Sequence, residues 1–251
     1  MSNTDFAEAI KVAARELPVI AIEVAENNSW NDATLKISAS CATLHLRGCL
    51  AASSIALKAG EHSVAITLVR QCIEAVSVFE LSLLDESVGG PLMQAWHDGK
   101  LTAGNLRAQL QQKAWSSYGD GLWREPWSDF MREFSRAVQT YAHYTQKLSL
   151  WQFHALSQPM PGDNGALLFA MHVGPDPDDD EKTNQVAVLH ALLLWWIGRI
   201  LLFHRPEIGA CVKPLVESLG TGLRGSGLLA EGYSWADMLL PVVCSTEPRG
   251  T

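Results

Sequence analysis

A continuous apolar stretch, VAVLHALLLWWIGRILLF, runs from Val186 to Phe203 and constrains the fold more than any other part of the sequence. It is about as long as the shortest membrane-spanning helices, which need roughly 17–25 residues. The stretch contains His190 and Arg199, and a charged arginine is costly to place in lipid. We therefore expect a helix buried in the protein core and no contact with a membrane, with a membrane span as the less favoured alternative.

Helical patterns extend over most of the remaining chain, and alternating strand patterns are nearly absent. Very short breaks separate the long segments, which implies antiparallel neighbours. The sequence therefore predicts an all-α fold, a helical bundle of long antiparallel helices with a C-terminal helical extension and at most a minor hairpin near Ala166 to Val173. The expected helices cover residues 5–28 (kinked or split at Pro18), 31–60, 62–86, 92–99, 102–115, 128–156, the apolar stretch, and a short piece of 205–227.

Composition favours one globular domain. The 251 residues are 47% hydrophobic and 18% charged, and no repeat or low-complexity linker divides them. The net charge of −8 gives no support to broad binding of polyanions, although a local basic pocket is compatible with it.

Five cysteines without paired spacing indicate reduced, mostly buried thiols. With no export signal at the N-terminus, we expect a cytoplasmic protein.

Sequence patterns for metals and cofactors are missing. The eight histidines form no HxxxH, HxH or HExxH pattern, and neither a phosphate-binding nor a dinucleotide-binding glycine motif occurs. The acidic run PDPDDDEK (Pro175 to Lys182) lacks the spacing of a calcium-binding loop. We expect this run to be a solvated loop whose last acids begin the next helix favourably. The sequence thus predicts no cofactor and no metal.

Arg70 and Glu74 lie four residues apart within LVRQCIEAVSVFELSLL, so they are close enough to pair on one helix face. Burying such a pair among apolar side chains is costly unless both groups bond well. We expect an internal ion pair that fixes how two helices pack, with support of a neighbouring polar site as the alternative.

Arg136 and His143 lie seven residues apart in FSRAVQTYAHYTQ, about two turns of an expected helix, so both face the same side. A histidine suits general acid–base catalysis, and a guanidinium suits a phosphate or an oxyanion. Two such groups make half of a catalytic site, which a second copy across a two-fold interface could complete. The alternative is that both side chains bond carboxylates of another helix, for example Glu74.

Taken together, these two helices resemble a recurrent helix pair in bacterial HEPN-like all-helical proteins. In that group an R-x-x-x-E helix precedes a helix with a Ser…His signature, and an Arg-x(4–6)-His motif marks the members that cut RNA. Here Arg70 and Glu74 match the first helix, Ser135 and His143 the second, and Arg136 the ribonuclease spacing. The resemblance spans Val64 to Trp151, which implies a HEPN-like core at about 32–157 and a helical extension at about 158–251.

The resemblance implies a metal-independent endoribonuclease of a bacterial defence or toxin–antitoxin system. Arg136 and His143 would be its catalytic residues, and Arg70, Glu74 and Ser135 their supporting residues. RNA, an antitoxin or regulatory protein, and a second copy of the chain are the implied partners. Ribonuclease members usually carry Asn or Asp after the arginine, where this sequence has Ala137. A noncatalytic helical module that binds a ligand or a protein is therefore the alternative.

Overall fold

The computed structural model describes residues 3–139, 141, 146–155, 160–161, 167–168 and 171–229. The all-α expectation is confirmed, because helices dominate these residues and the strands are very short. The elements are α1 (Asn3–Glu26), α2 (Ala33–Lys58), α3 (His62–Leu81), α4 (Glu86–His97), α5 (Ala103–Lys113), η1 (Trp115–Ser117), α6 (Trp127–Gln139), α7 (Gln146–Ser149), η2 (Leu150–Gln152), β1 (Phe153–Ala155), β2 (Met160–Pro161), β3 (Leu167–Leu168), β4 (Met171–Val173), α8 (Asp180–His204), η3 (Pro206–Ile208) and α9 (Gly209–Gly225).

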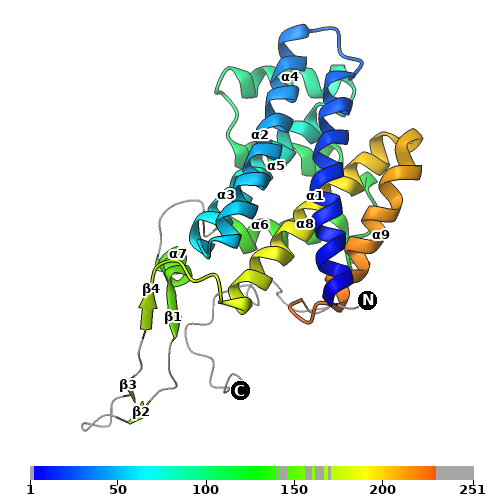
Figure 1. Cartoon of the computed structure of the whole chain (residues 1–251). Helices are drawn as coiled ribbons and strands as arrows, with labels where there is room; N and C mark the ends of the chain where they lie inside the picture. Colours follow the sequence, from blue (N-terminus) through cyan, green and yellow to red (C-terminus); the bar gives the residue numbers. More distant parts are fainter. Residues whose placement is uncertain are drawn as a thin grey trace.

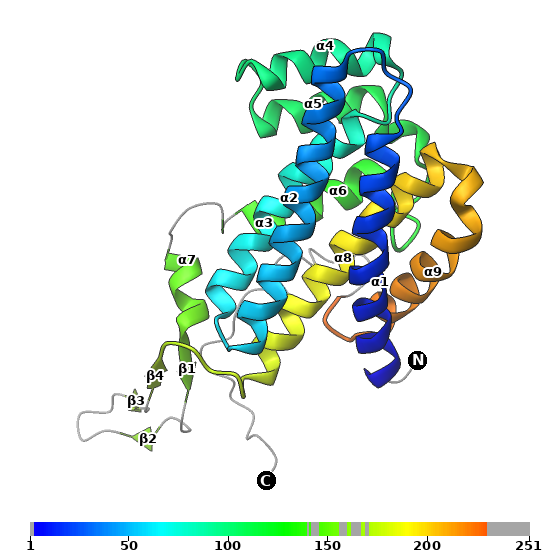
Figure 2. The same ribbon diagram turned by 45° about the horizontal axis from the view of Figure 1, so that its top comes forward.

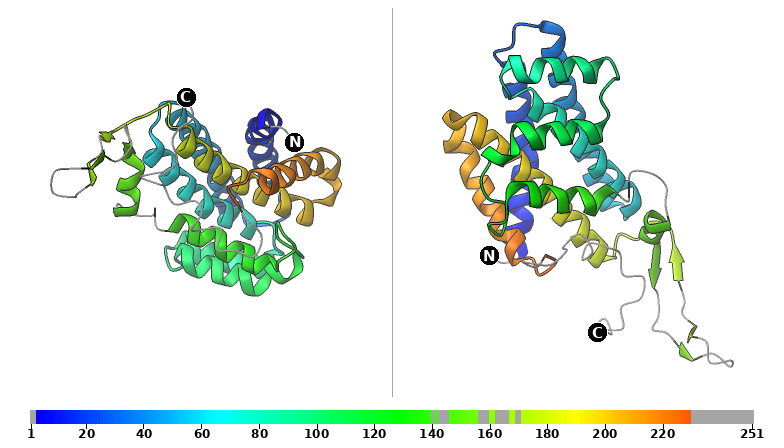
Figure 3. Two further views of the ribbon diagram at one scale, coloured as in Figure 1. Left: turned by 90° about the horizontal axis from the view of Figure 1, so that it is seen from below. Right: turned by 180° about the vertical axis from the view of Figure 1, so that it is seen from behind.

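Helices α1, α2 and α3 lie side by side, and α8 crosses beneath them with α9 at its flank (Figures 1 and 2). Helices α4 and α5 cover one end of this group, and the strands project from the other end, as the view from behind also shows (Figure 3). One continuous apolar core contains residues from α1 through α9. Helix α8 packs on α1, α3 and α9, so the C-terminal part of the chain shares that core.

The apolar stretch lies in α8, and 78% of its membrane-length window is buried inside the protein. By length and composition alone α8 could cross a membrane, but its burial against three other helices matches the expected core helix. Trp196 and Ile197 at its centre are fully buried. Gly198 lies against Val216 of α9, whose methyl group would collide with any larger side chain at this position.

Two helices contain residues that often break helices. Helix α1 continues through Pro18, so of the two expected outcomes, a kink or a split, the split does not occur. Helix α4 begins at Glu86 and runs through Gly89 and Pro91, where a break was expected. Gly89 is needed there because a Cβ atom would lie 2.6 Å from Cζ2 of Trp30. Close packing of one helix on a tryptophan thus explains a glycine that looks like a helix breaker in the sequence.

Asp32 begins α2 as expected, since its carboxylate accepts hydrogen bonds from the backbone of Thr34 at 2.8 Å and Leu35 at 3.1 Å. The helix stops just before Gly60, which has a φ of 75°. A Cβ atom at Gly60 would collide with the backbone of Asp176, and the Gly60 carbonyl accepts a hydrogen bond from the Asp176 N–H. The α2–α3 turn is therefore docked on the loop before α8.

The expected helix over residues 128–156 is wrong in its second half. Residues 150–152 form a 3-10 turn, and strand β1 follows at Phe153, pairing antiparallel with β4 in the register Phe153 to Val173. Strands β2 and β3 pair in the same way further out. The minor hairpin is present and begins earlier than residue 166.

The cysteines also differ from expectation: Cys49 and Cys72 are buried, Cys41 and Cys211 are exposed, and Cys244 lies outside the described residues.

Candidate functional site

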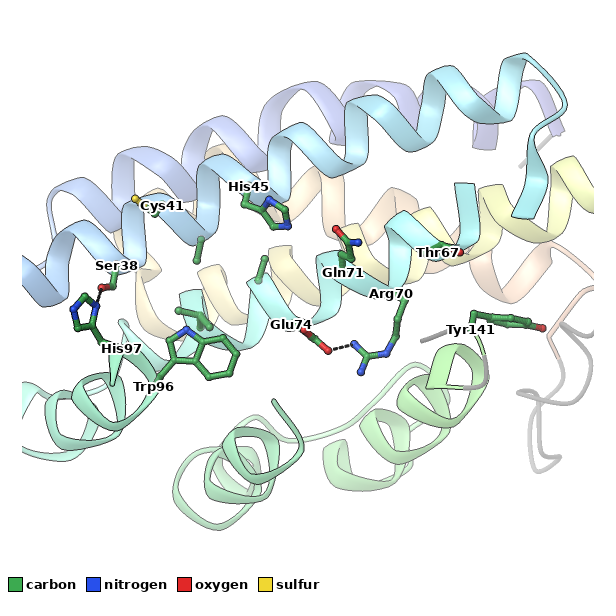
Figure 4. A pocket seen from close by; sticks show the side chains of 13 residues that line it. Ser38, Cys41, His45, Thr67, Arg70, Gln71, Glu74, Trp96, His97 and Tyr141 are labelled. Carbon is green, nitrogen blue, oxygen red and sulfur yellow. Dashed lines mark hydrogen bonds and ion pairs between the residues drawn. The ribbon is translucent and has the colours of Figure 1, made fainter. Parts of the chain in front are cut away.

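A cavity of about 800 Å³ opens between α2, α3 and α4 (Figure 4). Its volume is in the range of small-molecule sites, which is roughly 300–1,000 Å³. The polar side chains that line it are Ser38, Cys41, His45, Thr67, Arg70, Gln71, Glu74, His97 and Tyr141, and Trp96 adds a flat apolar surface. At one end, Ser38 contacts His97 through Oγ and Nδ1 at 3.3 Å. The cavity thus combines a charged wall with an aromatic one.

Arg70 and Glu74 form the predicted pair on this wall. Arg70 Nη1 lies 2.8 Å from Glu74 Oε1, while the arginine side chain is 11% exposed and the glutamate 40% (Figure 4). The distance is that of an ion pair, but the angle at Nη1 does not meet that of a hydrogen bond. Much of the hydrogen-bonding capacity of Arg70 is therefore still available on a surface that faces open volume.

Arg107 of α5 brings a second guanidinium close to Arg70 and Glu74, although Arg107 itself is not among the residues that line the cavity. Its Nη1 atom is buried and has no hydrogen-bond partner among the described residues. Burial lowers the pKa of Arg107, the nearby Arg70 lowers it further, and Glu74 opposes both. Arginine remains charged in proteins despite such shifts. We name Arg70 and Arg107 the guanidinium pair: two positive charges share the one carboxylate of Glu74, which leaves an excess of one.

Of the two expected catalytic residues, the structure describes only Arg136. Arg136 is on α6 with its side chain 48% exposed, and it binds Glu133 of its own helix at 3.0 Å. Ser135 is half-buried on α6, and the following Ala137 is buried, so the position after Arg136 faces the core. His143 lies outside the described residues, and the structure does not place it. Arg136 is absent from the cavity lining, whereas Tyr141 belongs to it.

Sequence reasoning missed a second group of charges, at the base of the strands. We name it the Asp179 cluster: His154 of β1, Asp176 and Asp179 of the following loop, and Lys182 of α8. Asp179 Oδ2 lies 2.8 Å from His154 Nδ1 and 3.4 Å from Lys182 Nζ, and all three residues are at most 4% exposed. Asp179 also accepts the Lys182 backbone N–H at 3.1 Å, which caps α8. The acidic run is therefore not a fully solvated loop.

Hydrogen bonds link His154 and Asp179 of this cluster to each other and to the backbone. His154 Nδ1 faces the Asp179 carboxylate, and its Nε2 lies 2.9 Å from the carbonyl oxygen of Gly174. Lys182 Nζ, which only donates, lies 3.3 Å from the same Nδ1, so the ring is enclosed by two acceptors and one donor. Burial would raise the pKa of Asp179, but bonds from the Lys182 backbone and from His154 hold it below its usual value. The ammonium group of Lys182 thus faces the carboxylates of Asp179 and Asp176.

A metal ion is a second interpretation of the Asp179 cluster, because ligand atoms of His154, Asp176 and Asp179 lie within 4.8 Å of one another. The ammonium group of Lys182 already lies among these atoms, 3.3 Å from His154 Nδ1, and it also bonds the carbonyl of Phe153. An internal cation therefore supplies the positive charge that a metal would bring. The donor set suits a structural link between β1 and α8 better than a metal centre.

A third charged group, Glu80 of α3, is fully buried beneath α8. Trp115 Nε1 donates to its Oε1 at 2.9 Å. Burial raises the pKa of Glu80 to about 7, although bonds from Tyr118, Trp115 and Trp196 oppose the rise. The Tyr118 hydroxyl also lies 2.7 Å from His204 Nε2. The partners of Glu80 are buried aromatic side chains, which indicates a structural network around this acid.

The sequence contained two weak indications of these charged groups, the spacing of Arg70 and Glu74 and the HEPN-like resemblance. The i, i+4 spacing located Arg70 and Glu74, but Arg107 lies on another helix and shares no motif with them. The HEPN-like resemblance concerns the helices that carry Arg70 and Arg136. Comparisons of the chain with protein-family models, with curated proteins and with solved structures found no match.

Proposed function

We propose that this chain is a noncatalytic helical binding module whose cavity between α2, α3 and α4 takes a small anionic ligand of mononucleotide size. The observation that carries the proposal is the guanidinium pair. Arg70 lines the cavity, and its buried Nη1 atom, like that of the neighbouring Arg107, makes no hydrogen bond among the described residues, which is unfavourable in the empty protein. A phosphate or carboxylate group would supply the missing acceptor and neutralise the excess charge.

Two aromatic side chains of the cavity lining indicate which class of anionic ligand fits. Trp96 is half-buried at the cavity, and Tyr141 is held in place by an edge-to-face contact with Trp151 at 5.8 Å between ring centroids. Flat side chains of this kind stack on planar ring systems. A ligand with an anionic group and a planar ring, as in a 5′-mononucleotide, would use both walls.

Matched ligands test this proposal. We expect 5′-mononucleotides to raise the melting temperature of the purified protein, while the corresponding nucleosides, which lack the phosphate, do not. Arg70→Gln and Arg107→Gln should each weaken binding about 10–100-fold, the loss of about 1.5–3 kcal/mol for a hydrogen bond to a charged group. Arg132→Gln is the control, since Arg132 is 67% exposed and pairs with Asp129 on α6. Binding that survives both cavity substitutions would refute the proposal.

The second candidate is a HEPN-like, metal-independent endoribonuclease of a defence or toxin–antitoxin system. It is supported by the resemblance and by Tyr141, which lines the cavity two residues before His143. In this proposal Arg136 binds the scissile phosphate, His143 transfers protons, and RNA, an antitoxin and a second copy of the chain are the partners.

Cleavage of RNA by the purified protein in the presence of a metal chelator tests this second candidate. The proposal predicts cleavage that His143→Ala and Arg136→Ala both abolish without loss of helical circular dichroism, while Arg132→Ala retains it. Light scattering tests the dimer. RNA that stays intact, or that both variants still cut, rules the ribonuclease out and leaves the binding proposal standing.

A further inference from the structure

Cys49 of α2 stands directly behind the cavity wall. Its Sγ lies 3.3 Å from His45 Nε2, one helical turn earlier, and 3.6 Å from Gln71 Oε1 of α3. Both neighbours line the cavity, and Figure 4 shows their side chains facing each other between the two helices. His45 is exposed and Cys49 itself is 6% exposed. A thiol in contact with an imidazole at the edge of an open volume is arranged as in nucleophilic cysteine sites.

A second thiol, Cys72 of α3, is fully buried next to Cys49, and its Sγ also lies 3.9 Å from the carbonyl oxygen of Leu46. A hydrogen bond from Cys72 lowers the pKa of Cys49 to about 6 against the opposing effect of burial, and His45 lowers it further. The same bond and burial raise the pKa of Cys72. Of the two thiols, Cys49 is therefore the one that loses its proton more readily.

We propose that Cys49 is a reactive thiol, oxidised by small hydroperoxides that enter through the cavity, and that Cys72 is its resolving thiol. The Cys49 thiolate attacks the terminal oxygen of the hydroperoxide. The S–O bond forms, the O–O bond breaks, and the departing alkoxide takes a proton from solvent water to leave as the alcohol. Cys49 becomes a sulfenic acid and the hydroperoxide is reduced.

In the second step the Cys72 sulfur attacks the Cys49 sulfur. The S–S bond forms, the S–O bond breaks, and the departing hydroxide takes the Cys72 proton to leave as water. Over both steps the two thiols lose two electrons to one hydroperoxide, and with hydrogen peroxide the products are the disulfide and two waters. The reaction does not require that the cavity bind the anionic ligand proposed above, because only the open volume is used.

The exposed cysteines provide the control. Cys41 and Cys211 are accessible, and Cys211 donates its S–H to the carbonyl of Ile208 at 3.0 Å. If access alone set the rate, iodoacetamide would alkylate these two first. If Cys49 is a thiolate, it should react about 20-fold faster than Cys211 at a pH of about 5.5, after allowing for the lower nucleophilicity of a low-pKa thiolate. Peptide mass spectrometry measures the three rates in one sample.

Hydrogen peroxide then tests the resolving step in the full-length protein. The expected product is a Cys49–Cys72 disulfide. Cys72→Ser should stop the reaction at a sulfenic acid on Cys49, which dimedone traps, and His45→Gln should slow alkylation of Cys49 several-fold at acidic pH. Cys49 reacting more slowly than Cys211 in a protein with intact helical circular dichroism would overturn the proposal. A peroxide product that omits Cys49 would overturn it as well.

Discussion

The Asp179 cluster and the guanidinium pair both hold charge away from water, and they differ in how that charge is matched. In the cluster, the Lys182 ammonium and the His154 ring face the carboxylates of Asp176 and Asp179, so each charged group has a partner of opposite charge or a hydrogen bond. Beside the cavity, two guanidinium groups share Glu74, and one buried nitrogen of each makes no hydrogen bond in the described chain. Matched charge holds elements of the fold together, whereas unmatched charge beside open volume indicates a ligand.

The largest expected effect comes from breaking the matched group. Asp179→Ala would take this carboxylate away from the buried Lys182 ammonium and from the His154 ring and remove the cap of α8, which we expect to cost about 3–5 kcal/mol of unfolding free energy. Urea denaturation followed by circular dichroism measures this loss. Asp178→Ala, at the exposed neighbouring position, is the control and should change stability by less than about 0.5 kcal/mol. A loss below about 1 kcal/mol for Asp179→Ala would contradict the structural role of the cluster.

Glu80 extends the comparison to a buried acid without a cation. Its pKa in the folded protein is about 7 and its ordinary value is 4.5, so the folded state binds the proton more tightly. The stability contributed by the protonated form is full below pH 4.5 and is lost as the pH rises towards 7. Over that interval the loss amounts to about 3 kcal/mol.

Glu80→Gln removes this titration. The difference in unfolding free energy between the variant and the parent protein should therefore shift by about 3 kcal/mol in favour of the variant between acidic and neutral pH. Burial lowers the pKa values of His190 and His204 to about 4, but these histidines are present in both proteins and largely cancel. Urea denaturation at a series of pH values checks the difference. A difference that does not change with pH would mean that Glu80 is already ionised.

Arg107→Met tests the guanidinium pair, in which the positive charge is not fully matched. Because the substitution removes a buried cation that lacks a full set of partners and keeps most of the apolar stem, we expect stability to rise by up to about 1 kcal/mol. Binding of an anionic ligand should weaken at the same time. Thermal unfolding with and without a mononucleotide measures both effects. Arg132→Met on the exposed face of α6 should leave both unchanged, and a destabilised Arg107→Met protein would place Arg107 among the structural charges.

Glu74→Gln should have the smallest effect on stability. The pair with Arg70 is partly exposed and spans one helical turn, so its loss should cost about 0.3–0.5 kcal/mol. The affinity for an anion should rise several-fold, since the carboxylate no longer competes for Arg70. Calorimetric titration with a mononucleotide checks the second outcome, and an unchanged or weaker affinity would separate Arg70 from the binding site.

Local sequence patterns located what depends on neighbouring residues. Helix content, the Asp32 cap, the buried apolar helix and the spacing of Arg70 and Glu74 were all readable from nearby positions. The turn to strand at Phe153 was not, because β1 is defined by its pairing with β4 many residues later. The burial of Asp179 was missed for the same reason, since its partner His154 belongs to that strand. Arg107 reaches Glu74 and Arg70 only because α5 packs on α3.

The way in which α8 is covered has a consequence for folding during synthesis. Its apolar surface is covered by α1 and α3, which precede it in the chain, and by α9, which follows. During synthesis the first two of these helices leave the ribosome before α8 does, so a docking surface exists when α8 emerges. The last part of that cover arrives only with α9. In this interval a segment long and apolar enough for a membrane has only part of its final cover, the part that α1 and α3 supply.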